Sequence, residues 1–363
     1  MSLVKLGDIA RECRSTYSGN KSGIPIVGLE HLTPGDIVLH SWDIDTDNTF
    51  SKSFKKGQVL LGRRRVYLKK ASVAPFDGIC SGDITVIEAI PEKLHPDLLP
   101  FIIQNDRFFE FAIIGSAGSL SPRVKWEYLK EYEINLPELN QQGKLVELLT
   151  SANELKHSYK EMILATDEMV KSQFIEKTSM SSSPSVSLKD VVSIVRKNVN
   201  PVSGEKYTLY SFPAYDNQQI PEIVDGGEIR SCKLALTPNT VLYNKLNVRL
   251  CRVWNIREIA TINNICSTEF IPLKMDDTVL LQEYLVYFLT SEAVTKAMVG
   301  VSQGTSNSQK RIAPEALLKL EIPLPPVDVQ KEFVAVYKQA DKSKFELKQA
   351  IEKIDKVMRA LMQ

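Results

Sequence analysis

The chain contains the same short landmarks twice, and this internal repeat constrains the fold more than any other feature. Residues 4–10 (VKLGDIA) match residues 186–192 (VSLKDVV), and the string ICS at residues 79–81 returns at 265–267. The separation is about half of the 363 residues and grows from about 182 to about 188 along the chain. Landmarks repeated in unchanged order predict two copies of one domain, the second with a few added loop residues.

A helical period follows a Leu-Pro landmark in each copy. Residues 134–142 (INLPELNQQ) align with 322–330 (IPLPPVDVQ). After each landmark, apolar residues recur at alternating spacings of three and four, which is the a/d pattern of a coiled coil. The pattern predicts helices over residues 140–176 and 328–362, each about 50 Å long at 1.5 Å per residue. The predicted coiled-coil core consists of Leu145, Leu148, Leu155, Tyr159, Met162, Met169, Phe333, Val336, Leu347, Ile354, Val357 and Leu361.

Strand-like runs in each copy, combined with these helices, predict an α+β protein. Its two α/β domains are related by the internal repeat and a pseudo-twofold axis, and two long coiled-coil helices separate them. The predicted segments are a first domain at 1–137, its helix at 138–177, a linker at 178–185, a second domain at 186–325 and its helix at 326–363.

The composition is that of an ordinary globular protein. Hydrophobic residues make up 43% of the chain and charged residues 25%, as in folded domains with buried cores. Lys and Arg number 45 against 44 Asp and Glu, so any surface for nucleic acid must be local. Five scattered cysteines without a C-x-x-C motif favour a reducing compartment. No uncharged apolar run approaches the ~20 residues of a membrane span. We therefore expect a soluble, cytoplasmic protein without membrane contact.

The sequence lacks the motifs of the enzymes that act on nucleic acids. The one Pro-Pro pair, Pro325-Pro326, precedes Val327, whereas an amino-methyltransferase needs an Asn/Asp-Pro-Pro-aromatic motif to hold a flipped base. Neither a phosphate loop nor a G-x-G-x-x-G fingerprint occurs. The four histidines show no ligand spacing. These absences predict a chain that is not an enzyme and binds no cofactor and no metal.

The succession of globular domain, Leu-Pro landmark and heptad helix, repeated once, resembles the specificity subunit of type I restriction-modification systems over essentially the whole chain. The clearest local likeness is residues 322–330, which follow the family's boundary between recognition domain and helix, together with residues 303–306 (QGTS) before it. The first copy departs from the pattern at Asn135, Glu138 and residues 116–120.

This resemblance implies a function in DNA recognition. Each globular unit would be a target-recognition domain that reads one half of a bipartite, asymmetric sequence in double-stranded DNA. The helices would form an antiparallel spacer on which methylation subunits dock, with restriction subunits joining the full complex.

Two stretches in each copy carry side chains suited to DNA: a basic stretch rich in Arg or Lys, and a polar run. Arg can bridge guanine O6 and N7 or clamp phosphate, whereas Lys mainly offers charge. The polar run 303–311 and its counterpart 116–125 add donors and acceptors for base edges. The alternative for each stretch is a plain solvated loop. The candidate DNA-binding residues are Arg63, Arg64, Arg65, Lys69, Lys70, Arg123, Lys125, Lys245, Asn247, Arg249, Arg252, Gln303, Ser306, Asn307, Lys310 and Arg311.

Two other functions compete with DNA recognition. The first is a coiled-coil scaffolding protein whose duplicated domains bind protein, and the second is a hydrolase with a duplicated domain. Salt-dependent binding to duplex DNA would separate DNA recognition from both. The residue types do not specify the target bases, because readout also depends on loop geometry and DNA shape.

Overall fold

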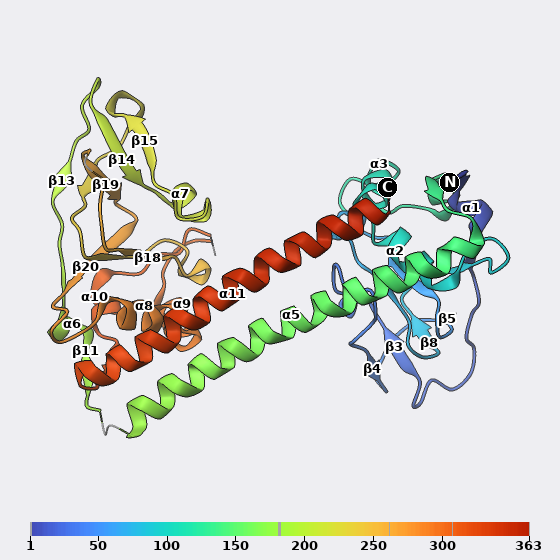
Figure 1. Ribbon diagram of the computed structural model, residues 1–363, viewed down its shortest axis with the longest axis horizontal. Helices are drawn as coiled ribbons and strands as arrows, with labels where there is room; N and C mark the ends of the chain where they lie inside the picture. The colour runs from blue at the N-terminus through green and yellow to red at the C-terminus, as the bar shows by residue number, and fades with distance from the viewer. Residues whose placement is uncertain (1, 181–182, 261, 307, 363) are drawn as a thin grey trace. The chain divides into compact units, whose positions relative to one another are not determined.

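The computed structural model describes residues 2–180, 183–260, 262–306 and 308–362. The chain divides into two compact units, one formed by Met1–Ile163 with Phe345–Gln363 and the other by Leu164–Lys344. Each unit holds one globular domain and part of each long helix. These helices are α5 (Leu139–Met180) and α11 (Val327–Leu361), green and red in Figure 1.

Two four-stranded sheets form the first globular domain. One has the strand order β2-β9-β6-β7 (Ala10–Cys13, Ile84–Ala89, Val59–Gly62, Ala71–Val73) and the other β4-β3-β8-β5 (Asp43–Ile44, Pro25–Val27, Gly78–Cys80, Lys52–Phe54). A separate antiparallel pair, β1 (Ser2–Lys5) and β10 (Glu133–Leu136), joins the two ends of the domain. The short helices are α1 (Leu6–Ile9), η1 (Val66–Leu68), η2 (Pro96–Leu98), α2 (Leu99–Ile103), α3 (Asp106–Ile114) and α4 (Trp126–Leu129).

The second domain repeats this arrangement. Its sheets have the orders β12-β20-β17-β18 (Val192–Ile194, Phe270–Met275, Thr240–Asn244, Val253–Ile256) and β13-β16-β19-β14-β15 (Asn198–Val199, Lys233–Ala235, Asn264–Ser267, Lys206–Tyr210, Glu222–Asp225). The pair β11 (Ser185–Ser187) and β21 (Glu321–Pro323) again joins the domain ends. Its short helices are α6 (Leu188–Val191), α7 (Phe212–Asp216), η3 (Gly226–Glu228), η4 (Val248–Leu250), α8 (Gln282–Thr290), α9 (Glu292–Val301) and α10 (Pro314–Leu318).

The strand pairings confirm the internal repeat predicted from the sequence. In each domain one parallel pairing, β3 with β8 or β14 with β19, lies in a sheet whose other pairings are antiparallel. The turn before β6 and β17 is also repeated, with Gly57 at φ 86° and Asn239 at φ 53°. Both residue types tolerate this left-handed conformation, Asn because its short side chain bonds locally. Strand β13 is an addition at the edge of the second domain's larger sheet.

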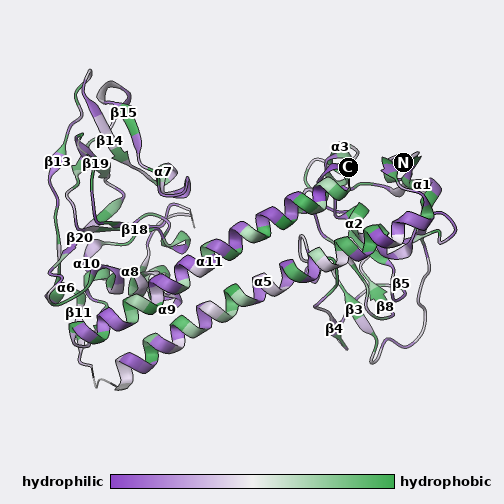
Figure 2. Ribbon diagram, in the orientation of Figure 1, coloured by the Kyte–Doolittle hydropathy of each residue, from purple (hydrophilic) through white to green (hydrophobic). Residues whose placement is uncertain are grey.

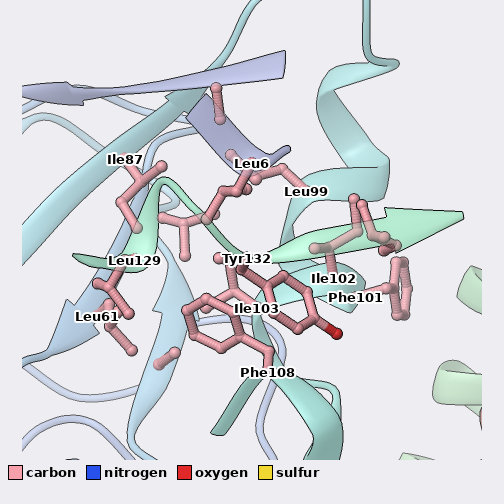
Figure 3. Close-up of a cluster of buried hydrophobic side chains, with 14 of the residues drawn as sticks. Leu6, Leu61, Ile87, Leu99, Phe101, Ile102, Ile103, Phe108, Leu129 and Tyr132 are labelled. Carbon is pink, nitrogen blue, oxygen red and sulfur yellow. The ribbon is translucent and has the colours of Figure 1, made fainter. Parts of the chain in front are cut away.

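The core of the first unit packs the sheet β2-β9-β6-β7 against the short helices. Figure 3 shows Leu6, Leu61 and Ile87 around the rings of Phe108 and Tyr132. Those two rings meet edge to face with centroids 5.3 Å apart. A fully buried apolar side chain of this size contributes about 1.5–3 kcal/mol, so this cluster stabilises the base of the domain.

The long helices pack antiparallel within each unit. In the second unit, Lys344 pairs with Asp167 at 2.7 Å and Lys177 pairs with Glu332 at 2.6 Å. Residue numbers therefore increase along one helix where they decrease along the other, as in an antiparallel pair. In the first unit Lys156 pairs with Asp355 at 2.6 Å. Lys156 and Asp167 of α5 hold the repeat positions of Lys344 and Asp355 of α11 at the offset of about 188. The repeat therefore extends to the contacts between the helices.

Part of the predicted helical core is wrong. Figure 2 shows apolar residues interleaved with polar ones along both helices, but one predicted position of each heptad on α5 faces outward. The residue that follows the predicted position is buried instead. This residue is Leu149 in the first unit and Val170 in the second. The outward residues are Leu148, Leu155, Met162 and Met169, which are 58%, 45%, 52% and 48% exposed.

On α11 the predicted core follows the burial more closely. Phe333 is fully buried, and Val336, Leu347, Ile354 and Leu361 are partly buried. Val357 is 54% exposed, and Met358 beside it packs against the first core instead. On α5, Leu145 and Tyr159 are partly buried.

A buried glutamine at the start of each long helix ties the helix to its domain. The Gln142 side chain accepts from His95 N (2.8 Å) and donates to Pro137 O (3.1 Å). Gln330 occupies the equivalent position; it accepts from Leu281 N and donates to Val279 O and Pro325 O, each at 2.9 Å. Buried amides persist only when hydrogen-bonded, so these contacts fix where each helix leaves its domain.

The first long helix is longer than the sequence predicted. Helix α5 continues to Met180, beyond the predicted end at residue 177, and residues 181–182 of the predicted linker lie outside the described ranges. No helix in those ranges has the length and apolar character needed to cross a bilayer.

Candidate nucleic-acid interface

Each domain has a basic loop between two antiparallel strands. The first basic loop (residues 63–70) connects β6 to β7, and the second basic loop (residues 245–252) connects β17 to β18. A 3-10 turn in each loop lies between two residues of positive φ: Arg65 and Lys69 at 52°, Asn247 at 50° and Cys251 at 34°. Left-handed backbone is costly for residues other than Gly and Asn. The same strained shape in both copies indicates a loop held by its surroundings.

The second predicted stretch of each domain lies directly beside the basic loop. We call residues 116–123 the first recognition loop and residues 303–311 the second recognition loop. Arg65 N donates to Pro122 O at 2.8 Å, and Asn247 N donates to Lys310 O at 2.8 Å. Isolated β-bridges join Arg64 to Arg123 and Leu246 to Arg311. Residues about 60 positions apart in the sequence thus form one surface in each domain.

An acidic residue beneath each recognition loop holds its arginine, and sequence reasoning missed both. Arg123 donates to Asp83 through Nε (2.7 Å) and Nη2 (3.2 Å). In the second domain Arg311 donates to Glu269, with Nε 3.2 Å from Oε2. The hydrogen bond from Arg123 holds the pKa of the Asp83 carboxyl below its ordinary value, so this group is charged at neutral pH. Both acids stand two residues after the serine of the repeated ICS landmark, which was the available signal.

Several predicted cations have no carboxylate partner within the described ranges. Arg65, Lys125 and Arg249 are also exposed. The Nε of Arg63 is buried without a hydrogen-bond partner. Arg63 lines an open hollow of about 530 Å³ with Lys52, Asp83 and Arg123. An unpaired arginine that lines such a hollow suits a phosphate-bearing ligand. The unpaired cations are Arg63, Arg65, Lys125, Lys245, Arg249 and Lys310.

Three other predicted cations are engaged by the protein itself. Arg252 makes a bidentate contact with Asp216 (2.8 and 2.7 Å) and lies 4.8 Å from the centre of the Phe212 ring. Its side chain is only 11% exposed, so we assign it a structural role and leave it out of the interface. Lys69 pairs with Asp106 at 2.6 Å. Lys70 donates to the Leu29 carbonyl at 2.7 Å.

Most of the remaining predicted residues belong to the recognition loops, and Arg64 belongs to the first basic loop. Gln303 pairs with Arg311 through backbone hydrogen bonds of 2.9 and 2.8 Å and is exposed. The Ser306 hydroxyl is exposed and lies 3.3 Å from that of Ser308. Asn307 lies outside the described residues. In the first domain Arg64 donates to the Ser121 hydroxyl at 3.1 Å and lies 3.6 Å from Asp83.

Candidate sites for other chemistry are few. Across the described ranges, no group of three or more His, Cys, Asp or Glu side chains is arranged to hold a metal ion. Cys80 and Cys266 are buried, and burial raises the pKa of each thiol to about 12. A protonated, buried thiol behaves as a small apolar side chain, so both cysteines belong to the core.

Comparison with known proteins gives a consistent result. The sequence profile of the family described as the type I restriction modification DNA specificity domain matches residues 2–164 and 181–356. The EcoDI specificity subunit of Escherichia coli, a type I restriction enzyme component, is 26% identical over 136 residues. That match covers 35% of this chain and 30% of the relative, so it spans about a third of each.

Two solved structures share the fold. A chain from a study of complex assembly and conformational transition in the type I restriction-modification system has a TM-score of 0.52 at 18% identity, covering 99% of this chain and 96% of that chain. The S subunit of a type I restriction-modification system from M. genitalium has a TM-score of 0.56 at 12% identity, covering 100% and 96%. Because the family profile matches most of both copies, this chain belongs to the family of type I restriction-modification DNA specificity domains.

Proposed function

We propose that this chain is the DNA-reading, non-catalytic specificity subunit of a type I restriction-modification complex. Each globular domain reads one half of a bipartite, asymmetric target in double-stranded DNA. One observation carries this proposal: in both domains the same strand framework brings a basic loop and a polar recognition loop together.

The chemistry of these paired loops supports binding to duplex DNA. Unpaired Arg and Lys side chains on the basic loops can neutralise phosphates and set the register on the duplex. Polar side chains on the recognition loops, such as Gln303, can exchange hydrogen bonds with base edges in the major groove. Surfaces of this kind give affinity from charge and selectivity from a few fixed donors and acceptors.

The long helices supply the docking surface for methylation subunits in this proposal. Leu148 and Leu155 lie seven residues apart on one face of α5, and they are 58% and 45% exposed. Exposed apolar residues at heptad spacing are typical of a helix that packs against a further helix. Replacing both with Asp is expected to reduce capture of the methylation subunit while the chain still folds. Replacing the nearby exposed Glu147 and Glu154 with Ala, outside this face, should leave capture unchanged.

Catalysis and cleavage belong to other subunits in this proposal, and the complex works in the cytoplasm. Methyl transfer by the purified chain with S-adenosylmethionine would contradict the non-catalytic part. The scaffolding alternative finds no support in the relatives, since the matching family is one of DNA specificity domains.

The salt dependence of DNA binding tests the proposal. Binding of the full chain to a duplex is measured at several salt concentrations, and log K is plotted against log[salt]. Each phosphate contact contributes about 0.9 to the slope. Replacing Arg63, Arg64, Arg65, Lys245 and Arg249 with Ala is therefore expected to lower both affinity and slope.

A charge-matched control separates contact from net charge. Lys319, Lys342, Lys348, Lys353 and Lys356 are exposed lysines outside the loops, and replacing all five with Ala removes the same charge. This control should keep most of the slope. If the loop variant and the control bind DNA like the wild type, the basic loops are only solvated surface and the proposal fails.

A further inference from the structure

The same pairing of acid and arginine occurs at the base of both recognition loops. In each pair the acid is the more buried partner. The side chains of Asp83 and Glu269 are 19% and 28% exposed, whereas those of Arg123 and Arg311 are 45% and 50% exposed. Each acid also accepts, through its backbone carbonyl, a hydrogen bond of 2.9 Å from the first residue of the basic loop. Each acidic residue thus contacts the basic loop through its backbone carbonyl and the recognition loop through its carboxylate.

The turns that carry the two acids share a hydrogen bond. Asp83 N donates to the Ser81 hydroxyl at 3.2 Å, and Glu269 N donates to the Ser267 hydroxyl at 3.2 Å. The side chain of the acid is therefore directed by a fixed backbone in both copies. Two domains whose loop sequences differ have kept this one arrangement.

Each arginine keeps donors for a ligand, although Arg311 also gives one Nη1 hydrogen to Gln309 O at 3.3 Å. Arg123 gives Asp83 its Nε hydrogen and one Nη2 hydrogen, which leaves its Nη1 group and the other Nη2 hydrogen without a partner in this contact. A guanidinium that is hydrogen-bonded to a carboxylate along one edge presents its other edge in a single orientation. A donor in fixed orientation discriminates between base edges, whereas a freely rotating arginine adapts to any phosphate.

We propose that Asp83 and Glu269 are positioning residues for sequence selectivity, each orienting the arginine of its own recognition loop toward the bases of one half-site. This inference rests on the proposed DNA-reading function and goes beyond it. The acids do not contact DNA; they act through Arg123 and Arg311.

Removing the acid should therefore lower sequence selectivity without lowering affinity for unrelated DNA. The freed arginine loses its orientation, so selectivity for the correct half-site falls. The surface also loses a negative charge, so affinity for unrelated DNA stays the same or increases. Structural damage to the loop would lower both together, which makes the combination diagnostic.

The two domains should differ in degree. Asp83 is also 3.6 Å from Arg64, whereas Leu246 stands at the corresponding position of the second domain. Asp83 thus organises two arginines and Glu269 one. The larger loss of selectivity is expected in the half-site read by the first domain.

The test is selection of binding sequences from a randomised duplex DNA library by the full chain. Wild type, Asp83→Asn, Glu269→Gln and the conservative variant Asp83→Glu are compared, with thermal unfolding as a check on folding. Asp83→Asn and Glu269→Gln are each expected to weaken base preference about tenfold or more in one half-site, and in opposite halves. Asp83→Glu should retain most of the preference, because it keeps the carboxylate.

Matched controls remove an acid elsewhere in each unit. Glu131→Gln and Asp328→Asn lose carboxylates that pair with Lys5 and Lys331 instead of a loop arginine, and both should keep the wild-type sequence preference. Unchanged preference in Asp83→Asn and Glu269→Gln, or an equal loss in both half-sites from either one, overturns this inference alone. A wild-type chain that enriches no sequence overturns the proposed function, and this inference with it.

Discussion

The two globular domains share their framework and differ in their loops. Both have the same order of paired strands, a buried glutamine at the root of the following helix, and an acid under the recognition loop. The basic loops, in contrast, read RRRVYLKK and KLNVRLCR. In each loop only the valine is buried. The buried residue is thus the same in both loops, while most of the other loop residues differ.

Under the proposed function, this difference would let one scaffold serve two specificities. A framework residue is held by many neighbours, so a change there costs stability. A loop residue facing solvent is free to change, provided that the residues below still fix the loop. The acids Asp83 and Glu269 lie at the border between these two groups.

The largest expected difference between the two copies is the stability contributed by packing near the start of each long helix. Phe333 is 1% exposed and its ring lies among those of Phe174, Tyr284 and Tyr287. Its counterpart on α5, Leu145, is only partly buried. Phe333→Ala should lower the free energy of unfolding by about 3–5 kcal/mol, and Leu145→Ala should cost less. Chemical denaturation of both variants measures the difference. Equal losses of unfolding free energy would show that the starts of the two helices are packed equally well.

The buried glutamines should give a smaller, graded effect. Gln330 takes part in three hydrogen bonds and Gln142 in two. Each backbone group left without a partner costs about 1–3 kcal/mol. Gln330→Ala should therefore lower the unfolding free energy more than Gln142→Ala does. Chemical denaturation measures both losses, and equal losses from the two variants would contradict this order.

Ion pairs between the helices should have the smallest effect. Lys156→Ala and Lys344→Ala should each change the unfolding free energy by less than about 1 kcal/mol, because the carboxylates they contact are 34% and 54% exposed. The exchange of charges in Lys156→Asp with Asp355→Lys should recover part of the loss, and the effect should shrink at high salt. A loss well above 1 kcal/mol would show that these pairs fix the helix register.

The sequence predicted the architecture well because repetition and period are global signals. The repeat and both long helices follow from them, whereas the antiparallel packing of the helices was implied by the resemblance to the specificity subunits. The error on α5 arose because Leu148 and Leu155 fit the heptad pattern as well as buried residues do. Periodicity locates apolar faces without showing which of two adjacent faces meets the other helix.

The candidate site was predicted only in part, since its geometry depends on distant residues. The basic and polar loops were identified, but nothing local shows that Arg252 is held by Asp216, 36 positions earlier. Asp83 and Glu269 were missed for a similar reason: acids are not expected in a candidate DNA interface until their arginine partners are seen. Ion pairs between segments far apart in the sequence require the fold.

The central claim is that the two domains read DNA separately, and exchanging one domain tests it most directly. Residues 1–137 are replaced by the corresponding domain of a related specificity subunit, and the DNA sequence modified by the assembled complex is determined. One half-site should change, while the other half-site and the gap between them stay the same, because the second domain and both helices are retained. A target altered in both halves, or not altered at all, would contradict the account.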